Sequence, residues 1–301
     1  MFGAFVKALA LAALVGVLHV HHEPSHDSDA PFADVLRAAG EAGLDFVVLT
    51  DHADVAEPSV LPAAEHAGVH VTPDGPVLVI VGGEFASRDG HLLGLGIERS
   101  VPAEDRAGRD VIADIHAQGG FAIVPHPFSH GGWRDWDADF DGLEVQNNAS
   151  DFTRLYGPLL PLRIARFAFD RDAALTRLWL RPAQELAKWD ELLAAGRRVP
   201  GFAGADAHQN VSVLGLQLDR YAQMFRGVRT VCPDAPLEAA AVLAELRRGA
   251  CAIHYAIYDG RAAEAREQRF PSGRVEMQLD GGARLLELRN PPFDPPPTRP
   301  R

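Results

Sequence analysis

Two histidines separated by a single residue, His19 and His21, form the first group in the sequence whose spacing could support chemistry. Residues 17–20 are expected to form a strand, and alternate side chains of a strand point to the same face of its sheet. Both imidazoles would then point to the same side and could bind one metal ion. On its own the pair is a weak indication, because a histidine in a strand is more often a hydrogen-bonded core or surface residue.

Further histidines and carboxylates follow this pair, mostly at the ends of apolar runs. Their number at such positions exceeds what chance placement would give, so we interpret them as metal ligands. Imidazole and carboxylate ligands together suit Zn, Mn or Fe. The two cysteines, Cys232 and Cys251, have no CxxC spacing, so neither a thiolate zinc site nor a disulfide framework is indicated. The candidate ligands are His19, His21, His26, His52, Glu84, His91, His126, Asp206 and His208.

The elements that must position these ligands alternate along the chain between short apolar runs and amphipathic helical stretches. This alternation predicts parallel strands in a layered or barrelled α/β domain. The carboxyl ends of parallel strands form one face, so residues at these ends converge although they are far apart in the sequence. Strands are expected at residues 17–20, 44–49, 77–81, 121–124, 143–145 and 199–204, and helices after Pro31 and around residues 111–117.

Six short motifs contain these ligands and occur in a fixed order. The motifs are LHVHHEPSH (18–26), LTDH (49–52), GGE (82–84), GHLLGLG (90–96), VPHP (124–127) and GADAH (204–208). In this order they resemble the motifs of the polymerase and histidinol phosphatase (PHP) superfamily of metal-dependent phosphoesterases. The resemblance covers roughly residues 17–208. It implies an α/β fold, a distorted TIM-like (β/α)7 barrel of the PHP type, with two to three metal ions at its C-terminal face.

The resemblance also implies how the ligands are shared among the ions. The implied sets are His19, His21, Glu84 and Asp206 for one ion, Glu84, His91 and His126 for a second, and His26, His52 and His208 for a third. Glu84 would bridge the first two ions. Either His26 or Asp27 could be the ligand of the third, because the family commonly has Asp at this position. His22 stands where the family usually has Thr, and we expect it to be a supporting or surface group.

Paired ions give this residue set a hydrolytic chemistry. Two ions about 3.5–4 Å apart can share a hydroxide, lower its pKa and stabilise the oxygens of an in-line phosphoryl displacement. We therefore expect a metal-bridging hydroxide to be the nucleophile, with Asp206 fixing its ion and Asp51 orienting a ligand or a water. His130 and Arg134 follow the VPHP motif and could hold a substrate phosphate, with a solvated loop as the alternative. Asn147 could line the pocket.

These expectations describe an enzyme that hydrolyses a small phosphate ester, either a phosphomonoester or a nucleotide, with two to three divalent ions of Zn, Mn or Fe. Hydrolysis of a C–N bond by an amidohydrolase-type enzyme is one alternative, which the lack of a recognisable lysine ligand weakens. A non-catalytic PHP-type metal-binding module is another, although such modules usually lack ligands that this chain has. The motifs leave the substrate open, since substrate choice resides in loops.

Charge and composition bear on the partners of the 301-residue chain. Its net charge of -12 and the lack of a basic run indicate no extended nucleic-acid surface, so a small phosphorylated substrate is the expected partner. Hydrophobic residues at 47% and charged residues at 23% are typical of a folded globular protein. The oligomeric state is not indicated by the sequence.

We expect three segments along the chain. Residues 1–16 carry one charge in an apolar run, which is typical of a signal-peptide core or a membrane anchor, with a buried helix or strand as the alternative. The first interpretation would make the protein membrane-associated or exported, and the second would leave it cytoplasmic. Residues 17–259 are expected to form the hydrolase domain. Residues 260–301 are a weakly patterned extension that ends in a Pro-rich tail.

Overall fold

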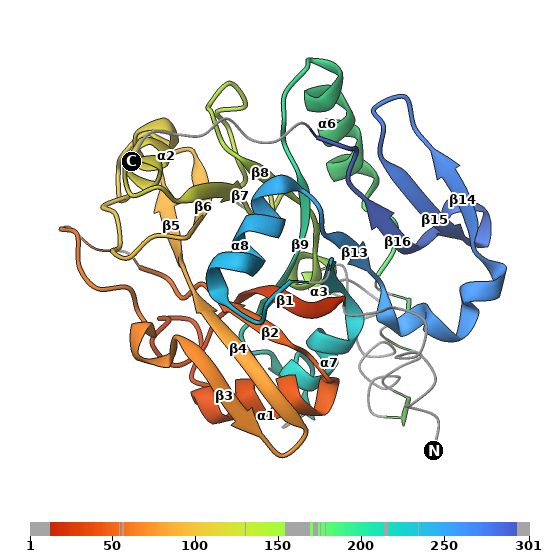
Figure 1. Ribbon diagram of the computed structural model, residues 1–301, viewed down its shortest axis with the longest axis horizontal. Coiled ribbons are helices and arrows are strands. Elements are labelled where there is room, and N and C mark those ends of the chain that lie inside the picture. The colour runs from red at the N-terminus through yellow and green to blue at the C-terminus, as the bar shows by residue number, and fades with distance from the viewer. Residues whose placement is uncertain are drawn as a thin grey trace.

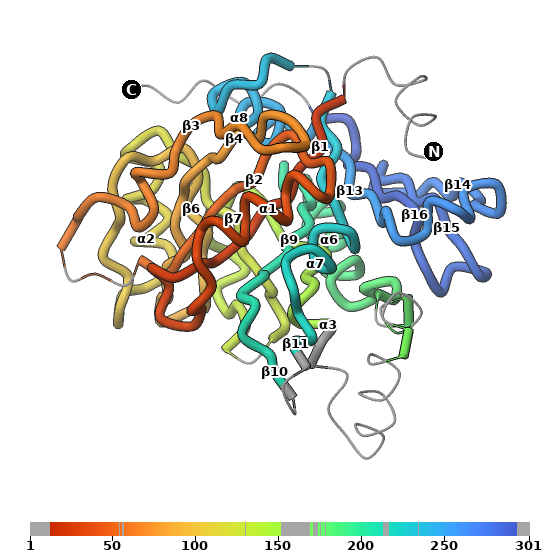
Figure 2. Tube along the Cα trace, turned by 90° about the horizontal axis from the view of Figure 1, so that it is seen from below, coloured from red at the N-terminus to blue at the C-terminus, as the bar shows by residue number. Residues whose placement is uncertain are grey.

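The computed structural model describes residues 13–293, with gaps at residues 54, 56, 130, 154–168, 171–173, 175, 178, 214, 215 and 234. Within these residues strands and helices alternate as the apolar periodicity predicted, and helices lie around a large sheet (Figure 1). A view turned by 90° places β14, β15 and β16 at one end of the molecule and α2 at the other (Figure 2). The ligand-bearing part of the chain lies between these ends.

The first part of the chain contributes short strands made of apolar residues that are buried on both faces, as expected for parallel strands. The first α-helix begins after Pro31 and ends at Gly43, whose φ of 67° is a conformation that favours glycine. The elements are β1 (Leu14–Val20), α1 (Phe32–Ala42), β2 (Phe46–Leu49), η1 (Ala64–His66), β3 (Gly68–Thr72), β4 (Gly75–Val81), β5 (Gly83–Ser87), β6 (Gly90–Leu95), α2 (Gly108–Ala117) and β7 (Phe121–Val124).

The second part adds two further parallel strands and then a run of antiparallel strands. Its elements are β8 (Gly142–Asn147), α3 (Asn148–Thr153), α6 (Ala183–Ala194), β9 (Gly201–Ala207), β10 (Ser212–Val213), β11 (Leu216–Gln217), α7 (Tyr221–Gly227), β12 (Arg229–Cys232), α8 (Ala239–Arg248), β13 (Ala252–His254), η2 (Ala256–Glu264), β14 (Arg266–Arg269), β15 (Val275–Leu279), η3 (Asp280–Gly282) and β16 (Arg284–Arg289). The parallel strands β8 and β9 pair with each other and complete the frame of the site.

Hydrogen bonds join the strands of this frame in the order β3-β4-β2-β1-β9-β8-β7-β6-β5. The neighbours from β4 to β7 in this order run parallel, whereas β6 pairs antiparallel with both β7 and β5. Parallel pairing brings the carboxyl ends of β1, β2, β7 and β9 to the same edge of the sheet. The apolar runs that precede the ligand residues in the sequence end at this edge.

The expected barrel is confirmed only as a mixed α/β fold with a large sheet. β5 and β6 depart from the uniformly parallel pattern, because two residues, Arg88 and Asp89, connect them and such a short turn requires antiparallel strands. Asp89-Gly90 is a hairpin signal in the sequence, and Gly90 adopts a φ of 122°. The strand pairing among the described residues does not by itself establish a closed barrel.

Described strands extend beyond both ends of the stretch 17–259 that was expected to form one domain, and the domain boundaries themselves stay a prediction. β1 starts at Leu14 and not at Val17, and residues Leu14 to Gly16 pair with β12, so they belong to the sheet. Residues 1–12 of the expected leader lie outside the described part. The helices of the described residues include none long and apolar enough to cross a membrane. At the other end, β16 pairs with β13, and β15 and β14 follow it, so these three strands extend the same sheet. The Pro-rich tail from residue 294 lies outside the described residues.

The two cysteines correct another expectation. Cys232 and Cys251 form a disulfide, whereas their spacing in the sequence indicated no disulfide framework. Cys232 ends β12 and Cys251 precedes β13, and the antiparallel pairing of these strands brings the two sulfurs together. The pairing depends on strand register, which cannot be predicted from the number and spacing of the cysteines.

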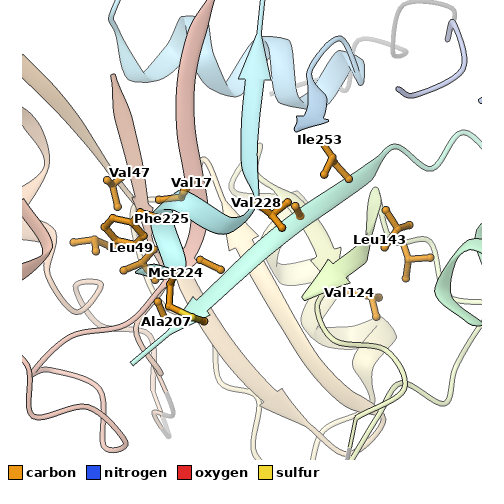
Figure 3. Packing of buried hydrophobic residues seen from close by; sticks show 14 of the residues in the cluster. Val17, Val47, Leu49, Val124, Leu143, Ala207, Met224, Phe225, Val228 and Ile253 are labelled. Atoms are coloured by element: carbon orange, nitrogen blue, oxygen red, sulfur yellow. The ribbon is translucent and has the colours of Figure 1, made fainter. Parts of the chain in front are cut away.

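An apolar layer between the sheet and α7 supports the strands that carry the first motifs. Val17 of β1 and the β2 residues Val47 and Leu49 lie beside Met224 and Phe225 of α7 (Figure 3). All five side chains are buried. Close packing of this kind fixes strand positions, because buried side chains in protein interiors leave few voids.

Candidate metal centre

The predicted ligands converge at the carboxyl ends of the parallel strands. His19, Glu84 and Asp206 lie on β1, β5 and β9. His52 and His126 stand in the loops that follow β2 and β7. Among the described residues, three groups of potential ligand atoms each lie within 4.8 Å of one another. The groups are His19, His21 and Asp206; His19, Glu84 and His126; and His21, Asp27, His52 and His208.

The imidazoles of His19 and His21 face the carboxylate of Asp206 in their own group and that of Glu84 in the neighbouring group. Nε2 of His19 lies 3.0 Å from Glu84 Oε2 and 3.5 Å from Asp206 Oδ1. Nε2 of His21 lies 3.1 Å and 3.7 Å from the same two oxygens. The side chains of His19, His21, Glu84 and Asp206 therefore lie close together, and their role as ligands of one ion stays a prediction.

Glu84 also faces a second set of histidines with its other oxygen. Oε1 of Glu84 lies 2.7 Å from His91 Nδ1 and 3.1 Å from His126 Nε2. Because the two carboxylate oxygens face different imidazoles, Glu84 has the geometry of a bridging ligand. The side chain of His91 is 35% exposed, whereas that of Glu84 is 2% exposed, so His91 stands at the rim.

The third group contains Asp27 in the place expected for His26. Oδ2 of Asp27 lies 2.9 Å from His208 Nε2 and 3.3 Å from His52 Nε2. The His26 ring packs on the His52 ring with centroids 4.5 Å apart and is outside the group of ligand atoms. The structure therefore places the carboxylate, and not the adjacent imidazole, among the ligand atoms of His52 and His208.

The donor atoms fit divalent ions. His21 Nε2 and Asp27 Oδ1 are buried and make no hydrogen bond of regular geometry among the described residues, although His21 Nε2 lies 3.1 Å from Glu84 Oε2. The opposite ring nitrogens are held, because Nδ1 of His21 lies 3.0 Å from Ser25 Oγ and Nδ1 of His126 lies 3.0 Å from Ser129 Oγ. Histidine ligands of metals are commonly held in this way through the second ring nitrogen. The inward atoms and the N/O donor set suit Zn, Mn or Fe.

The backbone is strained where three of these ligands stand. His19, His126 and Asp206 have φ values of 63°, 27° and 48°. Residues other than glycine rarely adopt this backbone conformation. Pairing of β1 with both β2 and β9 shifts register between residues 17 and 20. The regular alternation expected for the first histidine pair is therefore interrupted, and bulges of this kind redirect side chains beside functional sites.

The charges of the group favour cation binding. Burial opposes protonation of His19, but the carboxylates of Glu144, Asp206 and Glu84 outweigh it and raise the pKa of His19 well above its ordinary value. Burial also opposes protonation of His208, yet the neighbouring carboxylates raise the pKa of this imidazole to about 9. Burial would raise the pKa of Glu84, but His19, His126 and His21 outweigh it and hold this pKa well below the usual range. The carboxylates therefore stay ionised and attract cations.

The remaining predicted residues take different places. Asp51 is buried and accepts hydrogen bonds from the backbone N–H and from Nδ1 of His22, at 2.7 Å and 2.8 Å, so it orients His22 and not a candidate ligand. Asn147 lies in the site and donates to Asp206 Oδ2 at 3.1 Å. Arg134 is exposed and donates to the backbone oxygen of residue 88. His130 lies outside the described residues.

A buried carboxylate missed from the sequence stands directly behind the ligands. Glu144 of β8 is 1% exposed, and its Oε1 lies 2.7 Å from His19 Nδ1. The run GLEVQN of β8 is buried throughout, and a charged residue inside a fully buried strand was the signal that could have revealed it. Buried charges require partners, so such a residue points to a polar cluster nearby.

Comparison with known sequences gives one partial match. No family model matches the chain. The chain is 31% identical over 121 residues to the uncharacterised protein MJ1587 of Methanocaldococcus jannaschii, and the match covers 38% of this chain and 64% of that protein. The match therefore spans less than two thirds of the relative's length.

Solved structures similar to this chain include two kinds of protein. A two-domain protein of Bacteroides vulgatus, containing a predicted PHP-like metal-dependent phosphoesterase, is 16% identical with a TM-score of 0.48, over 89% of this chain and 77% of that chain. The lesion-specific endonuclease PfuEndoQ of Pyrococcus furiosus is 14% identical with a TM-score of 0.44, over 79% and 56% of the two chains.

The second kind of protein corrects the expectation about partners. Endonuclease Q in complex with a 27-mer duplex substrate, with an abasic lesion at its active site, is 15% identical to this chain with a TM-score of 0.41, over 79% and 56% of the two chains. This finding contradicts our expectation of a small phosphorylated substrate and of no extended nucleic-acid surface, which rested on the net charge of -12 and the lack of a basic run. In the structure, ligand residues from five of the six ordered motifs lie together in one centre.

Proposed function

We propose that this protein is a metal-dependent hydrolase of the PHP type that cleaves phosphate ester bonds. The observation that carries the proposal is the convergence of eight ligand side chains in three overlapping groups among the described residues. His19 and His21 each belong to two of these groups, so the groups adjoin one another and the ions that they bind would be neighbours. Overlap of this kind suits a multinuclear centre better than separate structural sites.

Each part of the centre has a distinct task in this proposal. His19, His21 and Asp206 would hold one ion, and Glu84 would hold it together with a neighbour through its second oxygen. Bound ions would lower the pKa of a water molecule and stabilise the charge that develops on phosphoryl oxygens. Asn147 keeps the Asp206 carboxylate in place by donating to its outer oxygen.

Charge balance favours an anionic substrate. The three groups contain three carboxylates, Asp27, Glu84 and Asp206, which contribute three negative charges. Two or three divalent ions would contribute four to six positive charges, so the loaded centre would keep a net charge of one to three. A positive centre attracts a phosphate although the whole chain carries a net charge of -12.

The cleaved bond is a phosphate ester, and an assay with small and large substrates determines which molecules carry it. Purified protein should be assayed with an aryl phosphomonoester, an aryl phosphodiester and a DNA duplex that contains an abasic site. We expect phosphate-ester cleavage that is lost with chelator and restored by Mn or Zn. Metal-dependent cleavage of an amide, with no cleavage of any phosphate ester, would contradict the proposal.

A further inference from the structure

Glu144 contacts several candidate ligands from behind and is itself outside the three ligand groups. Its Oε1 lies 2.7 Å from His19 Nδ1. Its Oε2 accepts a hydrogen bond from the backbone N–H of His126 at 3.0 Å and another from Asn147 Nδ2 at 2.9 Å. Asn147 also donates to Asp206 Oδ2 at 3.1 Å, so one carboxylate on β8 connects ligands from β1, β7 and β9.

We propose that Glu144 is the positioning residue that holds His19, His126 and, through Asn147, Asp206 in their metal-binding orientations. This inference rests on the metal centre of the proposed function. Glu144 directs none of its atoms into a ligand group, so its action on the ions is indirect.

The hydrogen bond to His19 determines which ring nitrogen is available. A carboxylate accepts a hydrogen bond, so Nδ1 of His19 carries the proton and donates it to Glu144. Nε2 is then the atom that faces Glu84 and Asp206 and can bind an ion. Carboxylates that hold the second nitrogen of a histidine ligand fix the ring orientation and increase the basicity of the other nitrogen.

The residues that Glu144 holds are the same three ligands whose backbone is strained. His19, His126 and Asp206 all have positive φ values, and such conformations are unfavourable for residues other than glycine. They persist only where surrounding contacts determine them. Glu144 supplies such a contact to the backbone of His126 directly and to the Asp206 side chain through Asn147.

The strand beside Glu144 leaves room for its carboxylate. A Cβ placed on Gly204 of β9 would lie 2.0 Å from Glu144 Oε1, so a larger residue at this position would displace the carboxylate. Gly204 itself offers no ligand atom. The change Gly204→Ala therefore disturbs Glu144 without removing any ligand or any hydrogen-bonding side chain, and provides a second test.

The test measures metal affinity in the full chain, without any substrate. Metal-free wild type, Glu144→Gln, Gly204→Ala and Tyr255→Phe would be titrated with Zn against a competing chelator. Tyr255→Phe is the matched control, because Tyr255 is buried and donates to Gln146 of the same strand, away from the ligands. Circular dichroism and thermal unfolding in chelator would report the fold of each variant.

We expect Glu144→Gln and Gly204→Ala to bind Zn about 10–100-fold more weakly than wild type, and Tyr255→Phe to bind like wild type. The Gln side chain keeps the volume but has one acceptor oxygen, so it cannot serve all three donors that the carboxylate accepts. Wild-type Zn affinity in folded Glu144→Gln, or equal loss in Tyr255→Phe, would overturn the inference.

The outcomes separate this inference from the proposed function. If wild type binds Zn and the two variants bind it more weakly, but no phosphate ester is cleaved, Glu144 is a positioning residue and the phosphoesterase proposal fails. If phosphate esters are cleaved and all variants bind Zn equally, the proposed function stands and the role of Glu144 fails. Wild type that binds no metal would overturn both.

Discussion

Oδ2 of Asp27 lies 2.9 Å from Nε2 of His208, which connects the loop after β1 to the end of β9. Burial alone would raise the pKa of Asp27, but its hydrogen bonds with His208 and His52 hold this pKa far below the usual range. The carboxylate is therefore an anion at neutral pH and presents a lone pair to any ion beside these imidazoles. The ring of His26, the adjacent residue, packs against the His52 ring with centroids 4.5 Å apart.

This relationship predicts different outcomes for two neighbouring substitutions. Asp27→Asn removes a negative charge and a ligand oxygen, so we expect the purified protein to lose about one bound ion per chain. His26→Gln should keep the wild-type metal content, because the His26 ring lies outside the ligand group. Elemental analysis of both proteins provides the measurement, and loss of metal in His26→Gln with full content in Asp27→Asn would reverse the assignment.

Asp206→Ala should be more harmful to catalysis than loss of any supporting residue. Asp206 faces His19 and His21, so its removal takes away a ligand and an anionic charge together. Supporting partners typically contribute about 10–100-fold, and we expect the loss of a direct ligand to exceed about 100-fold in turnover of an aryl phosphate.

Asp259→Ala is the matched control for this substitution, because Asp259 pairs with His254 and lies outside the ligand groups. It should turn over substrate like wild type. Circular dichroism would show that both variants are folded. Near-normal turnover in folded Asp206→Ala would show that the ligand assignment is wrong.

Metal binding should release protons at neutral pH. The pKa of His208 is raised to about 9 and that of His19 is also raised, so both imidazoles hold protons at pH 7 in the metal-free protein. An ion must displace these protons, and apparent affinity should therefore rise with pH up to about 9. Calorimetric titration with Zn in buffers of different ionisation enthalpy measures the release, and heats that are independent of the buffer would contradict this prediction.

The C-terminal strands contain a separate, buried charge network. Arg274 is 1% exposed and its guanidinium binds the carboxylates of Glu276 and Asp190. Burial would raise the pKa of Glu276, but Arg181, Gln278 and Arg274 outweigh it and lower this pKa below the ordinary value. A lowered folded-state pKa contributes stability above the unfolded value, and this contribution is lost as the pH falls through the folded value.

Arg274→Met should therefore destabilise the protein most at neutral pH. Removing Arg274 leaves Glu276 with Arg181 as its remaining ion-pair partner, so the loss should be smaller than the cost of about 3–5 kcal/mol that is typical of a buried charge left unpaired. The difference in unfolding free energy between wild type and variant should begin to shrink as the pH falls below about 4.5, the ordinary pKa of Glu276, and should disappear only below its lowered folded-state pKa. Urea unfolding at pH 7 and pH 4 tests this, and a difference that grows in acid would contradict the assigned network.

Several features of the site could be predicted from the sequence because they depend on order and local pattern. Apolar runs that end in His19, His52, Glu84, His126 and Asp206 predicted strand ends, and parallel pairing brings those ends together. The choice between His26 and Asp27 could not be made, since both lie in the loop after β1, where strand periodicity gives no direction for side chains.

Other features depend on contacts between distant segments. Glu144 acts through His19, His126 and Asn147, which come from other points in the chain, so the local sequence gave only an acidic residue in an apolar run. The disulfide of Cys232 with Cys251 requires the register of β12 and β13. Register is a long-range property, and neither composition nor spacing contains it.

The metal content of the purified protein tests the central claim most directly. Protein prepared without chelator should contain two to three divalent transition-metal ions per chain, because the ligand side chains form three overlapping groups among the described residues. Elemental analysis with a parallel determination of protein concentration gives this number. A content below one ion per chain, with no activation of phosphate-ester cleavage by added Mn or Zn, would contradict a metal-dependent hydrolase.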